Sequence, residues 1–193
     1  SDYARTKAEG EAAVFETLPD SVVMRPSILF GPEDHFFNRF AAMARVSPFL
    51  PLIGGGKTRF QPIFVADVAA AIADSVEGKA KAGTVYELGG PEIETFRALM
   101  EMTLAEIGRK RILLPIPWGA ASFMGGILQH LPGKMLTPDQ VRQLKVDNVV
   151  SEAAIAEGRT IESFGVRPTS LAAILPTYLT RFRKTGAYDR QLA

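Results

Sequence analysis

Cysteine is absent from the 193-residue sequence, and this absence excludes several kinds of chemistry. A chain without thiols has no disulfide bond, no thiolate nucleophile and no cysteine-ligated zinc. The two histidines, His35 and His130, lie far apart, and neither has a partner at the spacing of a metal site. We therefore predict no bound metal. The lack of cysteine is also compatible with a cytoplasmic compartment.

An excess of charge of either sign is absent as well. The chain has 22 lysine and arginine residues against 21 aspartate and glutamate residues, which gives a net charge of +1. Because no basic run is present either, the composition predicts no nucleic-acid partner. The N-terminus carries no charged segment followed by an apolar one, so the sequence predicts no secretion signal and favours a cytoplasmic location.

The sequence also lacks an apolar run that is free of helix-breaking residues. The longest uncharged run covers residues 112–133, which is long enough to cross a bilayer, but prolines and glycines interrupt it. We predict a buried strand, a turn and a helix here, with Trp118 and Phe123 in the core. The alternative is a face that contacts a partner or, peripherally, a membrane surface.

A glycine-rich phosphate-binding turn of the type G-x-x-G-x-x-G is missing too. Residues 54–57, Gly-Gly-Gly-Lys, are followed by threonine, yet the four-residue spacer of a phosphate loop is absent. We interpret them as a surface turn. In the run GPEDHFF, the residues Glu33, Asp34 and His35 are either solvated or turned toward a substrate in a cleft. Asp67 is expected to cap the helix that begins near Ala66.

The residues that are present predict an α/β class with a parallel sheet, because strands and helices alternate along the chain. Apolar residues make up 47% and charged residues 22%, which allows a sizeable core in one domain or one and a half. We expect a first domain over residues 1–110 and a smaller, mostly helical lobe over 111–193, with an interleaved boundary. The expected helices cover residues 2–17, 36–46, 66–76, 95–108, 118–130, 137–146, 151–157 and 170–183, and the strands 21–31, 83–90 and 110–117.

Tyr3 and Lys7 lie four residues apart near the start of the first expected helix, which places them on one face. A phenol next to an ammonium group can exchange protons. Lowering a tyrosine pKa from about 10 to about 7 requires roughly 4 kcal/mol, much of which a nearby cation in a partly dry cleft can supply. The spacing alone equally fits a tyrosine on a surface helix beside a solvated lysine.

Four segments in a fixed order change this balance: YARTKAEGE, VVMRPSILFGPED, FQPIFVADVAAAI and YELGGPE. Together they resemble the extended and atypical short-chain dehydrogenase/reductase superfamily, which includes the NAD-dependent epimerases and dehydratases. The runs RPSILFGPEDHFFNRFA and GGGKTRFQPIFVADVA, with the helical tail, resemble the NAD(P)H-binding accessory subunit of respiratory complex I and its bacterial relatives. This similarity covers nearly the whole chain.

The resemblance implies a fold, a cofactor and a site. The fold would be the C-terminal part of a Rossmann-like parallel sheet with a smaller helical lobe. The cofactor would be NAD or NADP. Tyr3 would be the proton-transfer phenol or a ribose-binding hydroxyl, and Lys7 would bond the nicotinamide ribose and lower the pKa of the phenol. Pro26, Ser27 and Ile28 would border the nicotinamide, although a simple core strand is the alternative for Ile28.

The chain departs from the family pattern at three points. The glycine-rich turn is missing, as is the active-site serine or threonine upstream of the tyrosine. We therefore expect the C-terminal part of a longer protein, which alone does not hold the dinucleotide tightly. The register of Arg59 is shifted by one residue, so Phe60 stands where sugar-nucleotide epimerases often carry a phosphate-binding arginine. This weakens an interpretation as a UDP-sugar enzyme.

Two classes of function follow from the resemblance. The first is a nucleotide-holding relative of the complex I accessory subunit, with respiratory complex I subunits as partners. It would lie in the cytoplasm or peripherally on the inner membrane. The second is an active oxidoreductase or epimerase, in which Tyr3 is the acid/base and Lys7 its activator on a hydroxyl or carbonyl substrate. A third alternative is an α/β unit without retained chemistry.

Overall fold

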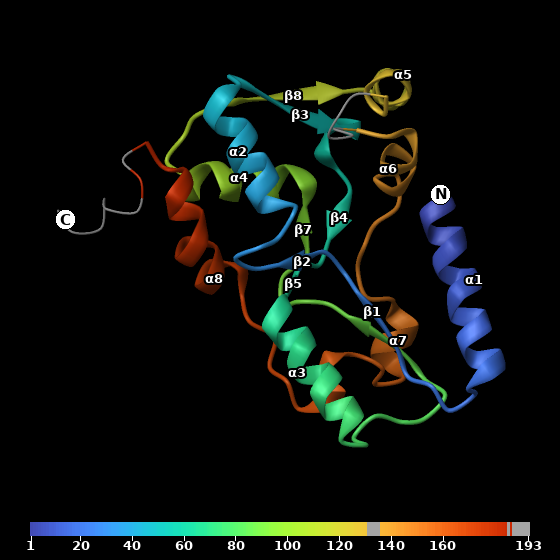
Figure 1. Ribbon diagram of the computed structural model, residues 1–193. Helices are drawn as coiled ribbons and strands as arrows, with labels where there is room; N and C mark the ends of the chain where they lie inside the picture. The colour runs from blue at the N-terminus through green and yellow to red at the C-terminus, as the bar shows by residue number, and fades with distance from the viewer. Residues whose placement is uncertain (131–135, 185, 187–193) are drawn as a thin grey trace.

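A computed structural model describes residues 1–130, 136–184 and 186 (Figure 1). Short strands alternate with helices, as the sequence predicts. The strands are β1 (Val23–Pro26), β2 (Leu29–Phe30), β3 (Phe49–Ile53), β4 (Arg59–Phe60), β5 (Ile63–Phe64), β6 (Val85–Leu88), β7 (Glu94–Thr95) and β8 (Ile112–Ile116). The helices are α1 (Asp2–Thr17), α2 (Phe37–Val46), α3 (Val65–Val76), α4 (Phe96–Glu106), α5 (Trp118–Leu128), α6 (Pro138–Gln143), α7 (Glu152–Ala156) and α8 (Leu171–Tyr178), with the 3₁₀ turns η1 (Gly54–Gly56), η2 (Ile161–Phe164) and η3 (Leu179–Phe182).

The strands pair mostly in parallel, which confirms the predicted α/β class. The pairs β1–β6, β2–β5 and β3–β8 are parallel, and β4–β7 is antiparallel. The single strand expected over residues 21–31 is two strands. At the break, the Ser27 amide donates to the Leu88 carbonyl, whereas the Ile28 carbonyl accepts from the Ile63 amide. The chain thus changes its pairing partner from β6 to β5 between these two residues.

Local signals locate most helix ends correctly. The Thr95 hydroxyl accepts a hydrogen bond from the Ala98 amide at 3.1 Å and so caps α4. Asp67 is not the cap of α3, contrary to the sequence interpretation. Its carboxylate instead accepts bonds from the amide and hydroxyl of Thr169, at 2.6 and 3.0 Å. The Asp67 carboxylate, which the local sequence predicts to cap the helix, therefore binds Thr169, a residue 102 positions away.

Strand β3 is not among the predicted strands. Its sequence, Phe-Leu-Pro-Leu-Ile, contains Pro51, and proline has no amide hydrogen for a sheet ladder. The pairing is nevertheless tolerated because β3 pairs with β8 in a two-stranded sheet. Within the described part of the chain, the other edge of β3 makes no ladder hydrogen bonds, so a missing amide hydrogen costs none there. Pro115 lies in the partner strand and pairs with Leu52.

The core consists of three clusters of buried side chains. The largest joins α2, β3, α4 and α8, the second lies under α3, β6 and η2, and the third lies between β3, β8, α5 and α6. Helix α8 and the turn η3 pack on α2 and α4. Side chains from the C-terminal part of the chain therefore share the largest core cluster with side chains from before residue 50. The division at residue 110 stays a prediction.

The run 112–133 forms a strand, β8, and a helix, α5, as predicted, and its residues 131–133 lie outside the described part of the chain. The strand is not buried as expected, because Ile112 and Leu114 are exposed. Trp118 packs against the third cluster, as expected of a core residue. It also crosses Gly54 in the glycine turn, where an added Cβ would lie 2.1 Å from the indole ring. Phe123 is 73% exposed, so its expected place in the core is wrong. None of the helices that the structure describes has the length and apolar character of a membrane-spanning helix.

Candidate functional site

Tyr3 and Lys7 lie together on α1, as their helical spacing predicts. The Lys7 Nζ atom is 5.7 Å from the centroid of the Tyr3 ring, so the ammonium group lies over the aromatic face. The Tyr3 side chain is 56% exposed, and none of the residues of α1, all of which the structure describes, is buried. The pair is therefore preassembled on an open helix face, with the phenol accessible from solvent.

Helix α1 is held at its start and near its middle by side chains from other elements. The Asp139 carboxylate of α6 accepts hydrogen bonds from the Asp2 and Tyr3 amides, at 2.7 and 3.2 Å. Asp139 thereby satisfies amides that a helix start leaves without a partner. Near the middle of α1, the Glu11 carboxylate accepts bonds from Arg25 in β1, with Nε at 3.0 Å from both oxygens. These contacts fix the helix against the strand that leads to Pro26.

The segment Pro26–Ile28 borders three cavities. Pro26 and Ser27 line a small one of about 200 Å³. Ile28 lines both a cavity of about 760 Å³, which we call the loop cavity, and one of about 280 Å³, which we call the aromatic cavity. Ser27 is buried, and its hydroxyl donates to the Asn148 carbonyl at 2.9 Å. This segment is where strand pairing changes, and the gap between the two strand pairs gives it open space on several sides.

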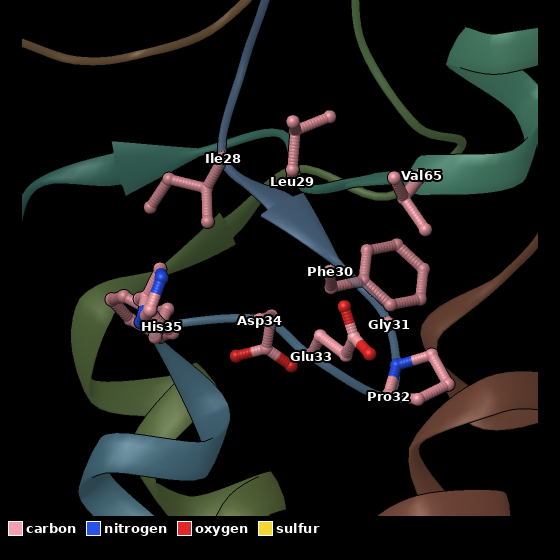
Figure 2. A pocket seen from close by; sticks show the side chains of 10 residues that line it. Ile28, Leu29, Phe30, Gly31, Pro32, Glu33, Asp34, His35 and Val65 are labelled. Atoms are coloured by element: carbon pink, nitrogen blue, oxygen red, sulfur yellow. The ribbon is translucent and has the colours of Figure 1, made fainter.

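The loop cavity combines an apolar wall with acidic groups. Residues 28–30 and Val65 supply the apolar side, and the loop 31–36 supplies the rest. Figure 2 shows the short strand β2 leading into the loop that carries Glu33, Asp34 and His35. The sequence left open whether these three residues are solvated or face a cleft, and all three line this cavity.

Asp34 holds the loop of this cavity in place through both carboxylate oxygens. One oxygen accepts from the Phe37 and Asn38 amides, at 2.6 and 3.2 Å, at the start of α2. The other accepts from the Tyr178 hydroxyl of α8 at 2.5 Å. Burial of Tyr178, together with the hydrogen bond to Asp34, raises the pKa of this phenol well above its ordinary value. The phenol therefore remains a hydrogen-bond donor to Asp34.

The predicted site residues form two groups in the structure. Tyr3 and Lys7 make one group on α1, and Pro26, Ser27 and Ile28 make the other at the cavities. Tyr3 and Lys7 are not among the described residues that line the three cavities. Sequence reasoning missed two linking elements, Asp139 with its bonds to α1 and the Asp34–Tyr178 pair. Both join positions more than 130 residues apart, so no local pattern announces them. No group of three or more metal-ligating side chains lies together in the described part of the chain.

Comparison with known proteins finds relatives in sequence and in fold, although no family model matches the sequence. The chain is 33% identical over 196 residues to "NADH dehydrogenase [ubiquinone] 1 alpha subcomplex subunit 9, mitochondrial" from Arabidopsis thaliana, covering 96% of this chain. The rat protein of the same name is 32% identical over 86% of this chain. The dTDP-glucose 4,6-dehydratase of Bacillus anthracis, solved with NAD, superposes with a TM-score of 0.61 over 93% of this chain, at 20% identity. The chain is a relative of these complex I subunits and shares its fold with the dehydratase.

The chain spans about half the length of the relatives that it matches. It covers 48% of the Arabidopsis protein, 44% of the rat protein and 49% of the Bacillus dehydratase. A further relative, 2-alkyl-3-oxoalkanoate reductase from Stenotrophomonas maltophilia, is 31% identical over 67% of this chain and 41% of its own length. The superposition on the Bacillus dehydratase confirms the Rossmann-like fold that the resemblance of the ordered motifs implies.

Proposed function

We propose that this protein is a nicotinamide-dinucleotide-holding relative of the complex I accessory subunits, with NAD or NADP bound at residues 26–28. The observation that carries the proposal is the segment Pro26–Ile28 itself, which borders three cavities beside a helix that presents Tyr3 and Lys7. The relatives named as NADH dehydrogenase subunits and the NAD in the Bacillus dehydratase structure support this proposal.

The residues of the loop cavity fit the nicotinamide end of the cofactor. Its volume of about 760 Å³ is in the range of small-molecule sites. The apolar wall of Ile28, Leu29 and Val65 suits a flat ring. The Glu33 carboxylate tolerates the cationic oxidised ring but repels a pyrophosphate, so the phosphates belong elsewhere. With the ring held there, the Lys7 ammonium would bond the ribose, and the Tyr3 hydroxyl would be the group that exchanges a proton with a substrate.

Nucleotide titration of the full-length protein tests this assignment. A charged hydrogen bond contributes about 1.5–3 kcal/mol, so Lys7→Gln should weaken NADH or NADPH binding by at least tenfold in calorimetry. Arg5→Gln is the matched control, because Arg5 lies on the same helix but pairs with Glu9 at 2.8 Å. An unchanged affinity for both dinucleotides in Lys7→Gln would refute the assignment, as would equal losses in the two variants.

A second candidate function is an active oxidoreductase or epimerase, which the preassembled Tyr3–Lys7 pair favours. A relative named as a reductase is consistent with it. General acid–base catalysis contributes about 10²–10⁴-fold, so Tyr3→Phe should reduce turnover of a carbonyl or alcohol substrate by that factor. Nucleotide affinity should be retained in this variant. Tight nucleotide binding without turnover in the wild type would contradict the enzymatic function and retain the nucleotide-holding function.

We further propose respiratory complex I subunits as partners, with the protein peripheral on the inner membrane or in the cytoplasm beside it. Exposed apolar side chains on β8 and α5 provide a surface for such a contact. Ile112, Leu114, Phe123 and Ile127 are all exposed on these two elements, which lie at one end of the molecule in Figure 1. Co-migration with respiratory complexes in native electrophoresis supports this partner, and migration as a free protein contradicts it.

A further inference from the structure

The aromatic cavity has a mostly apolar wall that is rich in phenyl rings. Its volume is about 280 Å³, and it lies between α2, β4, α4 and α6. The side chains that form the wall are Phe36, Phe40, Met43, Phe60, Phe96 and Leu144. Polar lining groups are restricted to one arginine, two glutamines and one asparagine among the described residues of the cavity. A wall of this composition gains free energy by excluding water from an apolar ligand.

The aromatic rings of this wall support one another in fixed positions. Phe96 contacts three of them edge-to-face, with centroid distances of 5.9 Å to Phe36, 5.5 Å to Phe40 and 6.4 Å to Phe60. Phe60 and Phe96 are buried, so they are held on their far side by the main core. The cavity is therefore preformed, and a ligand does not have to order its walls.

The strand that carries Phe60 brings no cation into the cavity. Arg59, the preceding residue, points to Asp147, whose carboxylate accepts from its amide and its Nε, both at 2.8 Å. Neighbouring side chains of a strand point to opposite faces. Because the register of Arg59 is shifted by one residue, the phenyl ring of Phe60 faces the cavity in place of the Arg59 guanidinium. A diphosphate at this wall would lose its hydration without gaining a counter-charge from β4.

The aromatic cavity adjoins the proposed nicotinamide position. Ile28 and Phe36 line both this cavity and the loop cavity. On the other side, α6 contributes Gln143, whose amide donates at 3.1 Å to the Asp139 carboxylate that holds the Tyr3 amide. A ligand in the aromatic cavity therefore lies between Ile28, which borders the proposed nicotinamide position, and α6, which anchors the start of α1 at Tyr3.

We propose that the aromatic cavity binds the alkyl chain of an aliphatic ketone or secondary alcohol, with the oxygen-bearing carbon next to Ile28. The proposal rests on the proposed function for the position of the nicotinamide, but binding of the chain depends on the aromatic wall alone. An alkyl chain suits this cavity better than a sugar nucleotide does, because eight of its twelve described lining residues are apolar and a single one of the twelve, Arg39, carries a positive charge.

Calorimetric titration of the full-length protein with 2-decanone tests the proposal, with UDP-glucose as the comparison ligand. Met43→Trp fills the cavity and should weaken 2-decanone binding at least tenfold. Val46→Trp is the control on the same helix, since Val46 is 86% exposed and does not line the cavity. Equal 2-decanone affinity in the wild type and Met43→Trp overturns the proposal, and so does tighter binding of UDP-glucose than of 2-decanone.

A second variant and a second ligand complete the experiment. Should Met43→Trp fail to fold by circular dichroism, Phe40→Ala replaces it. This variant enlarges the cavity, so it should shift the preference from 2-decanone toward 2-tridecanone, and an unchanged preference overturns the proposal. NADPH is titrated in parallel. Ketone binding without NADPH binding refutes the proposed function and leaves the cavity assignment intact, whereas NADPH binding without ketone binding refutes the cavity assignment alone.

Discussion

Asp34 and Tyr178 are the two residues on which the loop cavity most depends. The Asp34 carboxylate joins the start of α2 to the Tyr178 hydroxyl, and Tyr178 is buried in the main core. Tyr178→Phe leaves one carboxylate oxygen without its donor. Because a hydrogen bond to a charged group contributes about 1.5–3 kcal/mol, we expect a loss of this size in the free energy of unfolding, measured in urea. Tyr3→Phe, at an exposed position, should change it by less than about 0.5 kcal/mol. Equal effects of the two substitutions would contradict this role.

The same pair predicts a dependence of stability on alkaline pH. The raised pKa of Tyr178 means that the folded protein keeps a proton that the unfolded chain releases near pH 10. The contribution of Tyr178 to stability is therefore complete below about pH 10 and falls as the pH rises above it. Between pH 9 and 11, the urea midpoint of the wild type should fall more than that of Tyr178→Phe. Parallel curves for the two proteins would show that Tyr178 is not the group responsible.

Single residues also show where local sequence is informative. The Tyr3–Lys7 pair could be predicted because four residues make about one helical turn, and the two side chains do meet. Asp67 could not be placed, because Thr169, which binds it, is remote in sequence. Phe123 could not be placed either. Its apolar character predicts burial, but burial is decided by which face of α5 meets α6, and Phe123 lies on the other face.

At the scale of elements, α1 depends on attachment more than on burial. None of its residues is buried, all of them being described, while Asp139 binds its first amides and Arg25 binds Glu11. Asp139→Ala should therefore release the first turn of α1 and raise hydrogen exchange of amides 2–8, with little loss of global stability. The measurement is hydrogen–deuterium exchange with mass spectrometry. Asp147→Ala is the control, since Asp147 binds Arg59 instead. Unchanged exchange in α1 would argue against anchoring by Asp139.

The elements themselves could be predicted to different degrees. Helix α2 could be found from its amphipathic pattern and from Pro48 after it, and α4 from its Thr95 cap, and these are local properties. Strand β3 could not, because Pro51 argues against a strand unless the pairing with β8 is known. The division of residues 21–31 into β1 and β2 also depends on distant partners, since β6 and β5 determine where one strand ends and the next begins.

At the scale of the whole molecule, the resemblance carried by the ordered motifs predicts the Rossmann-like fold, but the motifs do not describe the cavities. The aromatic cavity joins β4, α4 and α6 to Ile28, and its wall includes Phe60, Phe96 and Leu144, from three separate parts of the chain. In the sequence these are ordinary apolar residues of predicted strands and helices. Their convergence depends on how the elements pack, which the order of motifs implies only through the fold of the family.

The exposed end formed by β8 and α5 carries the last prediction. The stretch from Ile107 to Pro138, which contains both elements, has no aspartate or glutamate, and Phe123 and Ile127 on α5 are 73% and 56% exposed. Introducing a carboxylate by Phe123→Asp places a charge on this apolar surface, where burial against a partner would cost several kcal/mol if the charge stayed unpaired. We therefore expect Phe123→Asp to reduce, by tenfold or more, the fraction of the full-length protein that co-migrates with respiratory complexes.

Folding stability should change by less than about 0.5 kcal/mol in this variant, because the replaced side chain is exposed. Ile155→Asp on α7 is the matched control, since Ile155 is 62% exposed and lies outside the β8–α5 end. It should leave co-migration unchanged. A partner that contacts another surface would give the opposite result, with association retained in Phe123→Asp. Loss of association in Ile155→Asp alone would place the contact at α7, because both substitutions add the same charge and differ only in position.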